Sequence, residues 1–382
     1  MVKKTVNSIL VTGFTTIILA VFLSPFLYMI FTSLKTQAQQ SVPSSPIWPA
    51  AYPTYVIPST VKGTFTLKVS KSGPLLDQTV DVSQFAGKTV DVYTVPVGPN
   101  GSGKQLALLM GFQKGSIFLD PANPTADPIV WNGGFFKTLP RDWSFSPAWG
   151  NYAEMWKDIN YPVVLWNTFQ YAVWTTIGVL VSCILVAYGF SRFRFPGRDL
   201  LFMVLISVLF LPIFVTVIPT FAFWTQLTDF LTKHGMPNFG VGTWWPLIIP
   251  SFFGNPYDVF LLRQYFMTLP RELDEAAMID GAGPLNILWS VIIPQSYPVI
   301  VAVTVFHIVY AWNDYFGPLI YLTNNRTAYP VSVALATFNG MFGTRPELIQ
   351  AGALVTLAFP LLLFFLAQRF FVQGIVITGV EK

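Results

Sequence analysis

Long stretches of this chain carry no charged residue. The first, residues 5–34, lies between Lys4 and Lys35 and is long enough to cross a bilayer as a helix, which takes about 20 residues. Because it is longer than the apolar part of a signal peptide and no small-residue cleavage site follows it, we expect an uncleaved membrane anchor. Five further apolar stretches follow, at residues 163–191, 200–228, 243–266, 297–322 and 348–371. The pattern therefore predicts six transmembrane helices.

The fourth of these stretches differs from the others. It contains Pro246, Pro250, Gly254 and Pro256, and it carries the charged Asp258. Proline and glycine interrupt helices, and a membrane tolerates the interruption only where neighbouring protein or a water cavity satisfies the freed backbone groups. We therefore expect a broken helix here, buried among the other spans.

Positive charges in the short connections give the expected orientation. Basic residues precede the first span, lie between the second and third, follow the fourth and end the sixth: Lys3, Lys4, Arg192, Arg194, Arg198, Arg263, Arg271 and Arg369. If six spans alternate, all of these fall on one side, which the positive-inside rule makes cytoplasmic. Both termini are then expected in the cytoplasm, and residues 36–160 on the outer face.

Residues 36–160 have a different pattern from the rest of the chain. Apolar and polar residues alternate at 63–70, 79–85 and 88–97, as they do in half-buried strands, and turn residues separate these stretches. The sequence predicts a small β-rich domain on the outer face. The alternative is a partly disordered loop.

One motif in this segment resembles a nucleotide-binding loop. The stretch "GPNGSGKQ" (98–105) nearly fits the phosphate loop Gly-x4-Gly-Lys-Ser/Thr, but Gln105 stands where the hydroxyl that binds magnesium is required. The expected topology also places it outside the cell, away from ATP. We interpret it as a turn.

Composition agrees with a membrane protein and excludes several other classes. Hydrophobic residues make up 53% of the 382 residues and charged residues only 10%, whereas soluble domains have about 25% charged. The net charge of +4 comes without a basic run, which argues against nucleic-acid binding. A single cysteine, Cys183, and two histidines, His234 and His307, argue against a disulfide or a metal cluster. With no catalytic constellation, we expect neither an enzyme nor a cofactor.

A charged and glycine-punctuated stretch interrupts the apolar C-terminal half. In "ELDEAAMIDGAG" (272–283), acidic residues follow Pro270 and suit the positive end of a helix, Gly281 suits a left-handed stop, and Pro284 suits the start of a second helix. Residues 270–294 therefore predict a helix, a tight turn and a helix at the cytoplasmic surface. Leu273, Ala276 and Ala277 share one small, flat face of the first helix. The alternative is an ordinary amphipathic helix resting on the membrane.

The same stretch resembles a known signature. "EAAMIDG" (275–281), nine residues and then "VIIP" (291–294) are similar to the pattern Glu-Ala-Ala, three residues, Gly, nine residues, Ile-x-Leu-Pro of ABC importer permeases. Four other segments resemble the carbohydrate-uptake branch, close to the G-type subunit of maltose-type systems: "WNTF" (166–169), "AYGFSRFRFPGRD" (187–199), "AWNDYFGPL" (311–319) and "QRFFVQGIVITG" (368–379). The resemblance covers residues 1–35 and about 160–382, but not the insertion between them.

The resemblance implies a role and a set of partners. The helix of the signature would dock on a cytoplasmic ATPase dimer and transmit its closure, with Glu275, Ala276, Ala277 and Gly281 as the coupling residues. A second permease subunit, in a heterodimer, and an extracytoplasmic sugar-binding protein would complete the importer in a bacterial or archaeal cytoplasmic membrane. The tail at 374–382 would reach toward the ATPase, although its "GVEK" ending departs from the basic-glycine ending of the family.

Polar residues inside the fifth span are candidates for the substrate path, because ionisable groups are costly inside a membrane. His307 and Asp314 lie seven residues apart, hence on one face, with Trp312 and Asn313 beside Asp314. Such a polar and aromatic cluster suits a sugar, whose hydroxyls need hydrogen bonds and whose ring faces stack on aromatic rings. The alternative is that these side chains bond neighbouring helices.

The sequence thus predicts an α-helical membrane protein with six transmembrane helices and a β-rich extracytoplasmic insertion between the first two. Its expected parts are an N-terminal helix (1–35), the insertion (36–160) and a five-helix core (161–382) with the coupling helix at 270–294. We expect the permease subunit of an ATP-driven sugar importer that does not itself hydrolyse ATP. The alternative is a membrane-anchored receptor whose outer domain binds a ligand or a cell-wall component.

Overall fold

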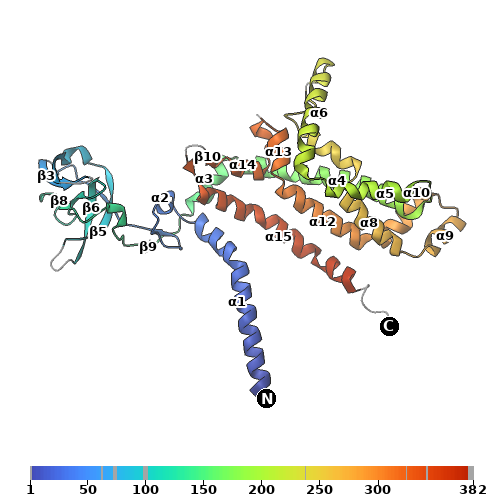
Figure 1. Cartoon of the computed structure of the whole chain (residues 1–382), viewed down its shortest axis with the longest axis horizontal. Coiled ribbons are helices and arrows are strands. Elements are labelled where there is room, and N and C mark those ends of the chain that lie inside the picture. The colour runs from blue at the N-terminus through green and yellow to red at the C-terminus, as the bar shows by residue number, and fades with distance from the viewer. Residues whose placement is uncertain are drawn as a thin grey trace. The chain divides into compact units, whose positions relative to one another are not determined.

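The computed structural model describes residues 2–61, 63–71, 75–97, 102–236, 238–323, 325–340 and 343–376. The chain divides into two compact units (Figure 1). One consists of Met1–Tyr152 with Arg345–Ala351, and the other of Ala153–Thr344 with Gly352–Lys382. Each unit has its own hydrophobic core.

The first unit begins with helix α1 (Val2–Ser33), which is long and apolar and contains Pro25. The chain leaves α1 and returns to its end after the whole insertion. The Nδ2 atom of Asn151 donates hydrogen bonds to the carbonyls of Ser33, at 2.7 Å, and Lys35, at 2.8 Å. The hydroxyls of Ser33 and Tyr152 are 2.8 Å apart. The two ends of the insertion are therefore fastened to each other beside the end of α1.

Between these ends the chain is rich in β-strands, as the alternating pattern predicts (Figure 1). The main sheet has five antiparallel strands in the order β2 (Thr54–Val56), β5 (Thr89–Pro96), β6 (Gly103–Gly111), β7 (Ser116–Leu119) and β8 (Ile129–Trp131). Strands β3 (Thr64–Ser70) and β4 (Leu75–Asp81) form a hairpin, and β1 (Ala50–Ala51) pairs with β9 (Ser144–Phe145). The described residues of this segment therefore form a β-rich region, in agreement with the predicted fold.

The sheet has an apolar layer on each face. Neighbours along β5 point to opposite faces, so Val92 belongs to one buried cluster and Tyr93 to the other. The same alternation recurs in β7, where Ile117 and Leu119 share a cluster with Val92, and Phe118 packs with Tyr93. Burial of both faces explains why all four residues of β7 are buried.

Two short segments of this unit differ from a regular strand. The strand predicted at 79–85 ends at Asp81, because the Asp81 carboxylate accepts a hydrogen bond from the Ser83 N–H at 2.9 Å and caps a short 3₁₀ turn, Val82–Phe85. In the phosphate-loop-like stretch, residues 98–101 lie outside the described residues. Its Lys104 pairs with Asp120, and this hydrogen bond lowers the pKa of the Asp120 carboxyl.

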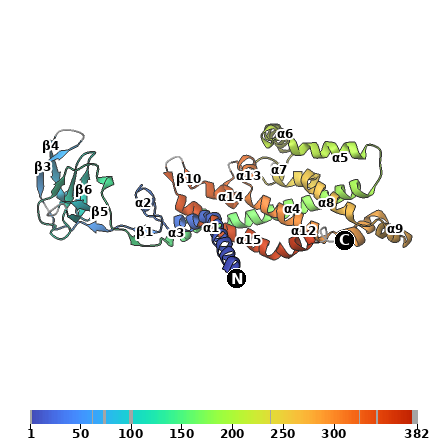
Figure 2. The same ribbon diagram turned by 60° about the horizontal axis from the view of Figure 1, so that its bottom comes forward.

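The second unit is built around helix α4 (Tyr161–Arg192). It packs against α8 (Pro256–Thr268) and α12 (Tyr297–Asn313), and these helices lie together in both views (Figures 1 and 2). The central core joins buried side chains of all three, among them Cys183, Leu262 and Val303. The lone cysteine is therefore a packing residue, and its sulfur accepts a hydrogen bond from the Asn255 N–H at 3.1 Å.

Other helices complete this unit. They are α5 (Arg198–Ser207), α6 (Ile213–Lys233), α9 (Glu272–Ile279), α10 (Pro284–Ile287), α11 (Ile293–Gln295), α13 (Phe316–Tyr321), α14 (Val331–Ala336) and most of α15 (Pro346–Val376). Within the described residues, three helices are long and apolar enough to cross a membrane: Leu10–Ser33, Tyr161–Arg192 and Pro346–Gln368. Two pairs of helices are bent at a short break, Arg198–Phe210 with Phe214–Lys233 and Pro284–Gln295 with Tyr297–Asn313. If each pair forms one span, the number is five, one fewer than the six that the sequence predicts.

The segment expected to be broken is indeed broken. It consists of α7 (Trp245–Ile248), a 3₁₀ turn (Ile249–Phe253) and α8, with Gly254 at a φ of 90° between the turn and α8. The break packs closely on α4: a Cβ atom added to Gly178 would lie 2.8 Å from the ring of Phe252. Glycine is therefore required on α4 at this point.

Candidate functional site

The acidic stretch forms the short helix α9 and a tight turn. The helix begins at Glu272, two residues after Pro270, and has three acidic residues in its first turn. Gly281 adopts the predicted left-handed conformation with a φ of 84°, and the Ala282 N–H donates to the Ala277 carbonyl at 2.9 Å. Pro284 opens α10, as predicted, and the helical run continues through a π-helical segment, Leu288–Ile292, and α11 to Gln295.

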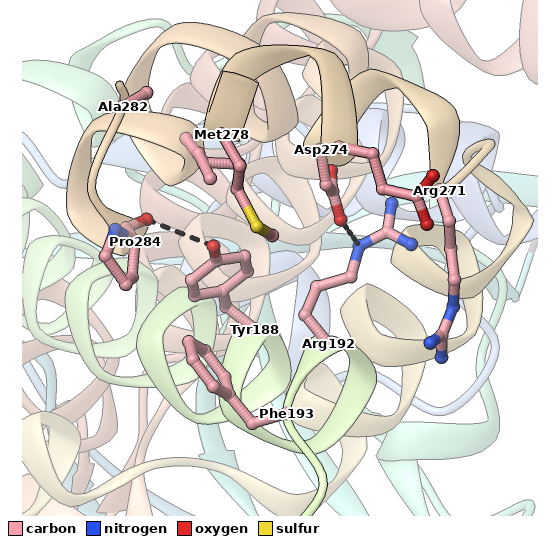
Figure 3. Close-up of a pocket in the computed structure, with 10 residues that line it drawn as sticks. Tyr188, Arg192, Phe193, Arg271, Asp274, Met278, Ala282 and Pro284 are labelled. Atoms are coloured by element: carbon pink, nitrogen blue, oxygen red, sulfur yellow. Dashed lines mark hydrogen bonds and ion pairs between the residues drawn. The ribbon is translucent and has the colours of Figure 1, made fainter. Parts of the chain in front are cut away.

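Helix α9 is fixed to the end of α4 by a buried ion pair (Figure 3). The Arg192 Nε atom lies 3.1 Å from the Asp274 carboxylate, and the two side chains are only 6% and 9% exposed. The other guanidinium nitrogens of Arg192 donate to the carbonyl of Leu269, just before α9, at 3.3 Å. Arg192 thus holds both the approach to α9 and its first turn.

The sequence did not reveal this pairing. Asp274 is one of three acidic residues that suit the helix end, and nothing in their spacing distinguishes it from Glu272 or Glu275. Only the packing of α9 on α4 turns Asp274 inward and leaves the other two exposed. Arg192 belongs to the set of basic residues that gives the expected orientation, and no local pattern marks its second role.

The four predicted coupling residues face different surroundings. Glu275, Ala276 and Gly281 are exposed, whereas Ala277 is half-buried against the core of α4 and α8. The small face predicted for the helix is therefore divided, with Ala277 facing inward and Ala276 outward. The exposed side also carries Ile279, which is 86% exposed and which the sequence analysis did not single out.

A cavity of about 340 Å³ lies between α9 and the end of α4 (Figure 3). Apolar side chains line much of it, including Phe193 and Met278, and Arg271 and Glu275 add charges. The Tyr188 hydroxyl donates to the Pro284 carbonyl at 3.0 Å, which ties α4 to the start of α10 as well. The first turn of α9 and the start of α10 are thus each held to α4, through Asp274 and Pro284.

A second cavity of about 340 Å³ lies beside the broken segment. It brings His307 and Asp314 together with Tyr171 and Tyr310, which the sequence analysis did not single out. The Tyr171 hydroxyl donates to the Asp314 carboxylate at 2.7 Å, and the Gly317 N–H donates to its other oxygen at 3.2 Å. This polar cavity gathers a carboxylate, an imidazole and phenol hydroxyls among membrane helices.

The other two substrate-path candidates lie elsewhere. Trp312 is buried, stacks on Phe359 with ring centroids 4.2 Å apart, and donates from its indole N–H to the Thr356 carbonyl at 3.3 Å. Asn313 is exposed, and its side chain donates to the Val309 carbonyl at 2.8 Å. Neither lines the polar cavity.

The polar cavity contains one unpaired polar atom. His307 is 8% exposed, and its buried Nε2 atom has no hydrogen-bond partner among the residues that the structure describes. Among the described residues, no group of three or more histidine, cysteine, aspartate or glutamate side chains is placed to hold a metal ion. The cavity is lined by hydrogen-bonding groups, among them the His307 imidazole and the Asp314 carboxylate.

Comparison with known proteins identifies the family. Residues 163–376 match the family described as "Binding-protein-dependent transport system inner membrane component". The osmoprotective compounds uptake permease protein GgtD of Synechocystis sp. is 33% identical over 233 residues, which are 61% of this chain and 75% of that protein.

Two further relatives extend the comparison. The sn-glycerol-3-phosphate transport system permease protein UgpE of Pectobacterium atrosepticum is 32% identical over 60% of this chain and 80% of its own length. The alpha-glucoside transport system permease protein AglG of Rhizobium meliloti is 28% identical over 60% of each chain.

A solved structure gives the fold. It is a bacterial ABC transporter involved in the import of the acidic polysaccharide alginate, and it is similar with a TM-score of 0.59 at 16% identity, over 97% of this chain and 98% of that chain. This likeness agrees with a helical permease fold. The predicted family is confirmed: the chain is an inner membrane component of a binding-protein-dependent transport system, and so belongs to the permeases of ABC importers.

Proposed function

We propose that this chain is the permease subunit that carries a sugar or oligosaccharide through an ATP-driven importer, after delivery by an extracytoplasmic binding protein. ATP hydrolysis takes place in a separate cytoplasmic ATPase dimer, and a second permease completes a heterodimer. The observation that carries this proposal is the placement of α9. This helix has an exposed side, and the Arg192–Asp274 ion pair joins it to the end of α4.

The outer side of α9 suits a docking partner. Ala276 and Ile279 are exposed, so a partner backbone can approach closely and bury apolar surface there. Glu275 adds a negative charge that suits a basic rim. The ATPase dimer therefore docks on this side of α9, and its closure moves α4 through Arg192. A ligand shifts a conformational equilibrium only if it binds the two states with different affinities. In the proposed importer, ATP bound to the partner ATPase supplies this difference in affinity.

The proposed topology has six spans, with both termini in the cytoplasm. The broken segment and α8 form the fourth span, although no single helix there is long enough to cross. The parts are then an N-terminal span at 1–35, an extracytoplasmic insertion at 36–160 and a five-span core at 161–382. The positions of Arg192 and Arg271, on one side of this arrangement, support the cytoplasmic location of α9.

A sugar substrate is supported by the polar cavity and by the relatives. One relative is named for the transport of alpha-glucosides, and the solved neighbour imports a polysaccharide. The cavity supplies the carboxylate and hydroxyl groups that sugar hydroxyls bind, in Asp314, Tyr171 and Tyr310. Of the predicted candidates, His307 and Asp314 line the proposed path, and Trp312 and Asn313 support the surrounding helices.

The receptor alternative is not favoured. The family match covers residues 163–376, which a receptor would use only as an anchor. For the insertion we propose a docking role, because its two ends meet beside the end of α1. It binds the extracytoplasmic binding protein or the partner permease. Deleting residues 45–155 from the assembled importer then weakens binding of the binding protein, and unchanged affinity would exclude that role.

Affinity purification from mildly solubilised native membranes tests the proposed function. We expect an ATPase and a second permease to copurify with the chain. The recovered complex, in liposomes with the binding protein, should take up sugars with ATP hydrolysis. Recovery of the chain alone, or with cell-wall proteins held by residues 36–160, would contradict the proposal.

A further inference from the structure

A third, larger cavity of about 530 Å³ is lined by residues of the broken segment that do not line the polar cavity. Aromatic side chains dominate its lining: Tyr171 and Trp174 of α4 with Trp244 and Trp245 at the start of the broken segment. Gln170 and Thr243 add polar groups at its wall. Its volume lies within the range of about 300–1,000 Å³ that is typical of small-molecule sites.

The two cavities meet at Tyr171. This residue lines both of them, with its ring 5.3 Å from the ring of Trp244 and its hydroxyl on the Asp314 carboxylate. The broken segment divides its side chains between the same two cavities: Trp244 faces the aromatic one and Leu247 the polar one. An aromatic surface and a half-buried carboxylate are thus separated by one tyrosine side chain.

This arrangement matches the chemistry of a pyranose. The C–H face of such a ring is apolar and packs on an indole, whereas the hydroxyls at its edge need donors and acceptors. Each Asp314 oxygen accepts one protein hydrogen bond and keeps capacity for another. Gln170 offers both a donor and an acceptor on an exposed side chain.

We propose that the aromatic cavity is a saccharide-binding site of this chain, in which Trp244 and Trp174 stack on a pyranose ring whose hydroxyls reach Gln170 and, past Tyr171, Asp314. This inference rests on the proposed importer function and names the substrate class of one site within it. The site differs from the cluster that the sequence suggested, because Trp312 and Asn313 lie outside both cavities.

A membrane-interface belt would place tryptophans differently. Such belts lie at the headgroup level, near the ends of spans. Trp174 is thirteen residues after the first residue of α4, or about 20 Å along the helix axis. Trp166 is only five residues into α4, so its position fits a belt, and it lines neither cavity. Its side chain is 57% exposed and that of Trp174 is 52% exposed, so the two are matched in exposure. Trp166 is therefore the matched control for Trp174.

The test uses the complete importer in liposomes with its binding protein. Uptake is measured for radiolabelled maltose, sucrose and trehalose, and for sn-glycerol 3-phosphate and glycine betaine as compounds without a pyranose ring. For the saccharide that is taken up, Trp244→Leu and Trp174→Leu should each raise the KM of uptake by about tenfold. ATP hydrolysis stimulated by the loaded binding protein should stay unchanged, and Trp166→Leu should alter neither quantity.

Three other outcomes would contradict the proposal. Saccharide uptake with the same KM in all three variants would overturn the site and leave the importer function intact. Uptake of only the compounds without a pyranose ring would overturn the saccharide class. Absence of both uptake and ATPase stimulation in the unaltered complex would overturn the proposed function itself, and the site with it.

A labelling experiment provides a second test of the site if the tryptophan variants fail to assemble. Gln170→Cys in a Cys183→Ala background places one thiol in the aromatic cavity, since the chain has no other cysteine. The transported saccharide should slow its reaction with a maleimide, and sn-glycerol 3-phosphate should not. Labelling at the same rate with and without the saccharide would contradict the site.

Discussion

The guanidinium of Arg192 lies 3.1 Å from the carboxylate of Asp274, so the last turn of α4 and the first turn of α9 share one buried ion pair (Figure 3). Removing one partner of such a pair costs about 3–5 kcal/mol, because the other charge stays buried without compensation. The pair therefore fixes where α9 stands relative to the membrane helices. In the proposed mechanism, movement of α9 is passed to α4 at this point.

Breaking the pair should uncouple transport from ATP hydrolysis. In Asp274→Ala we expect about tenfold less uptake per ATP hydrolysed, within the coupling free energies of about 1–3 kcal/mol that link distant sites. Uptake and phosphate release, measured together in liposomes, check this. The control is Asp199→Ala, because Asp199 pairs with Arg198 but is 74% exposed, and exposed pairs contribute little.

A double variant separates coupling from stability. Arg192→Met with Asp274→Leu replaces both charges by apolar groups, which restores much of the stability that one unpaired charge removes. We expect the complex to assemble while uptake per ATP remains low. Full recovery of coupling in the double variant would show that the pair serves stability alone.

Gly281 should tolerate a side chain only if the backbone can stay left-handed. Its φ is 84°, and a Cβ atom there would meet no atom within 4 Å, so the obstacle is conformational and not steric. The left-handed region costs most L residues about 1–2 kcal/mol and costs asparagine less. Gly281→Asn should therefore keep coupled uptake, while Gly281→Val and Gly281→Trp should lose most of it.

The neighbouring Gly283 provides the control. It also has open space around its Cα atom, but its φ of −74° suits any residue. Gly283→Ala should leave uptake per ATP nearly unchanged. If Gly281→Val and Gly283→Ala behaved alike, the left-handed turn would not be needed for coupling.

Gly317 should control the position of the Asp314 carboxylate. A Cβ atom on Gly317 would lie 2.7 Å from the Asp314 Oδ2 atom, which is the atom that accepts the Tyr171 hydrogen bond. Gly317→Ala should push the carboxylate away from Tyr171 and reduce uptake by about tenfold, a loss of about 1.4 kcal/mol. Initial rates of uptake across substrate concentrations measure this effect.

A double-mutant cycle tests whether the effect acts through Asp314. In an Asp314→Ala background the carboxylate is absent, so Gly317→Ala should have little further effect. Equal reductions in the two backgrounds would mean that Gly317→Ala acts by another route, such as its contact with Leu247 at 3.0 Å.

Gly178 should be required for packing of the broken segment on α4. A Cβ atom there would lie 2.8 Å from the Phe252 ring and 3.1 Å from the backbone carbonyl carbon of Ser251. Overpacking of this kind costs about 1–3 kcal/mol. Gly178→Ala should therefore lower the melting temperature of the purified complex.

Another glycine of the same helix supplies the comparison. Gly189 has no neighbour within 4 Å of an added Cβ atom, so Gly189→Ala should gain about 0.5–1 kcal/mol from the better helix propensity of alanine. If Gly178→Ala raised the melting temperature as Gly189→Ala does, the close approach of the broken segment would be ruled out as a constraint.

The features that the sequence determined are local or depend on composition. Uninterrupted apolar runs identify α1, α4 and α15, because a bilayer requires a fixed length of apolar helix. The left-handed turn at Gly281 follows from one residue type, and the break near Gly254 follows from prolines close together. The family signature could be recognised in the sequence because its residues are close together in one short segment.

The tertiary structure decided which side chains meet. Helical periodicity places His307 and Asp314 on one face of their own helix, but it does not say that Tyr171 of α4 lies opposite. In the same way Trp312 turned toward Phe359, and Asp274, among three similar acidic residues, was the one that reached Arg192. Such contacts depend on the rotation and depth of each helix against its neighbours, and these are set by packing across segments far apart in the chain.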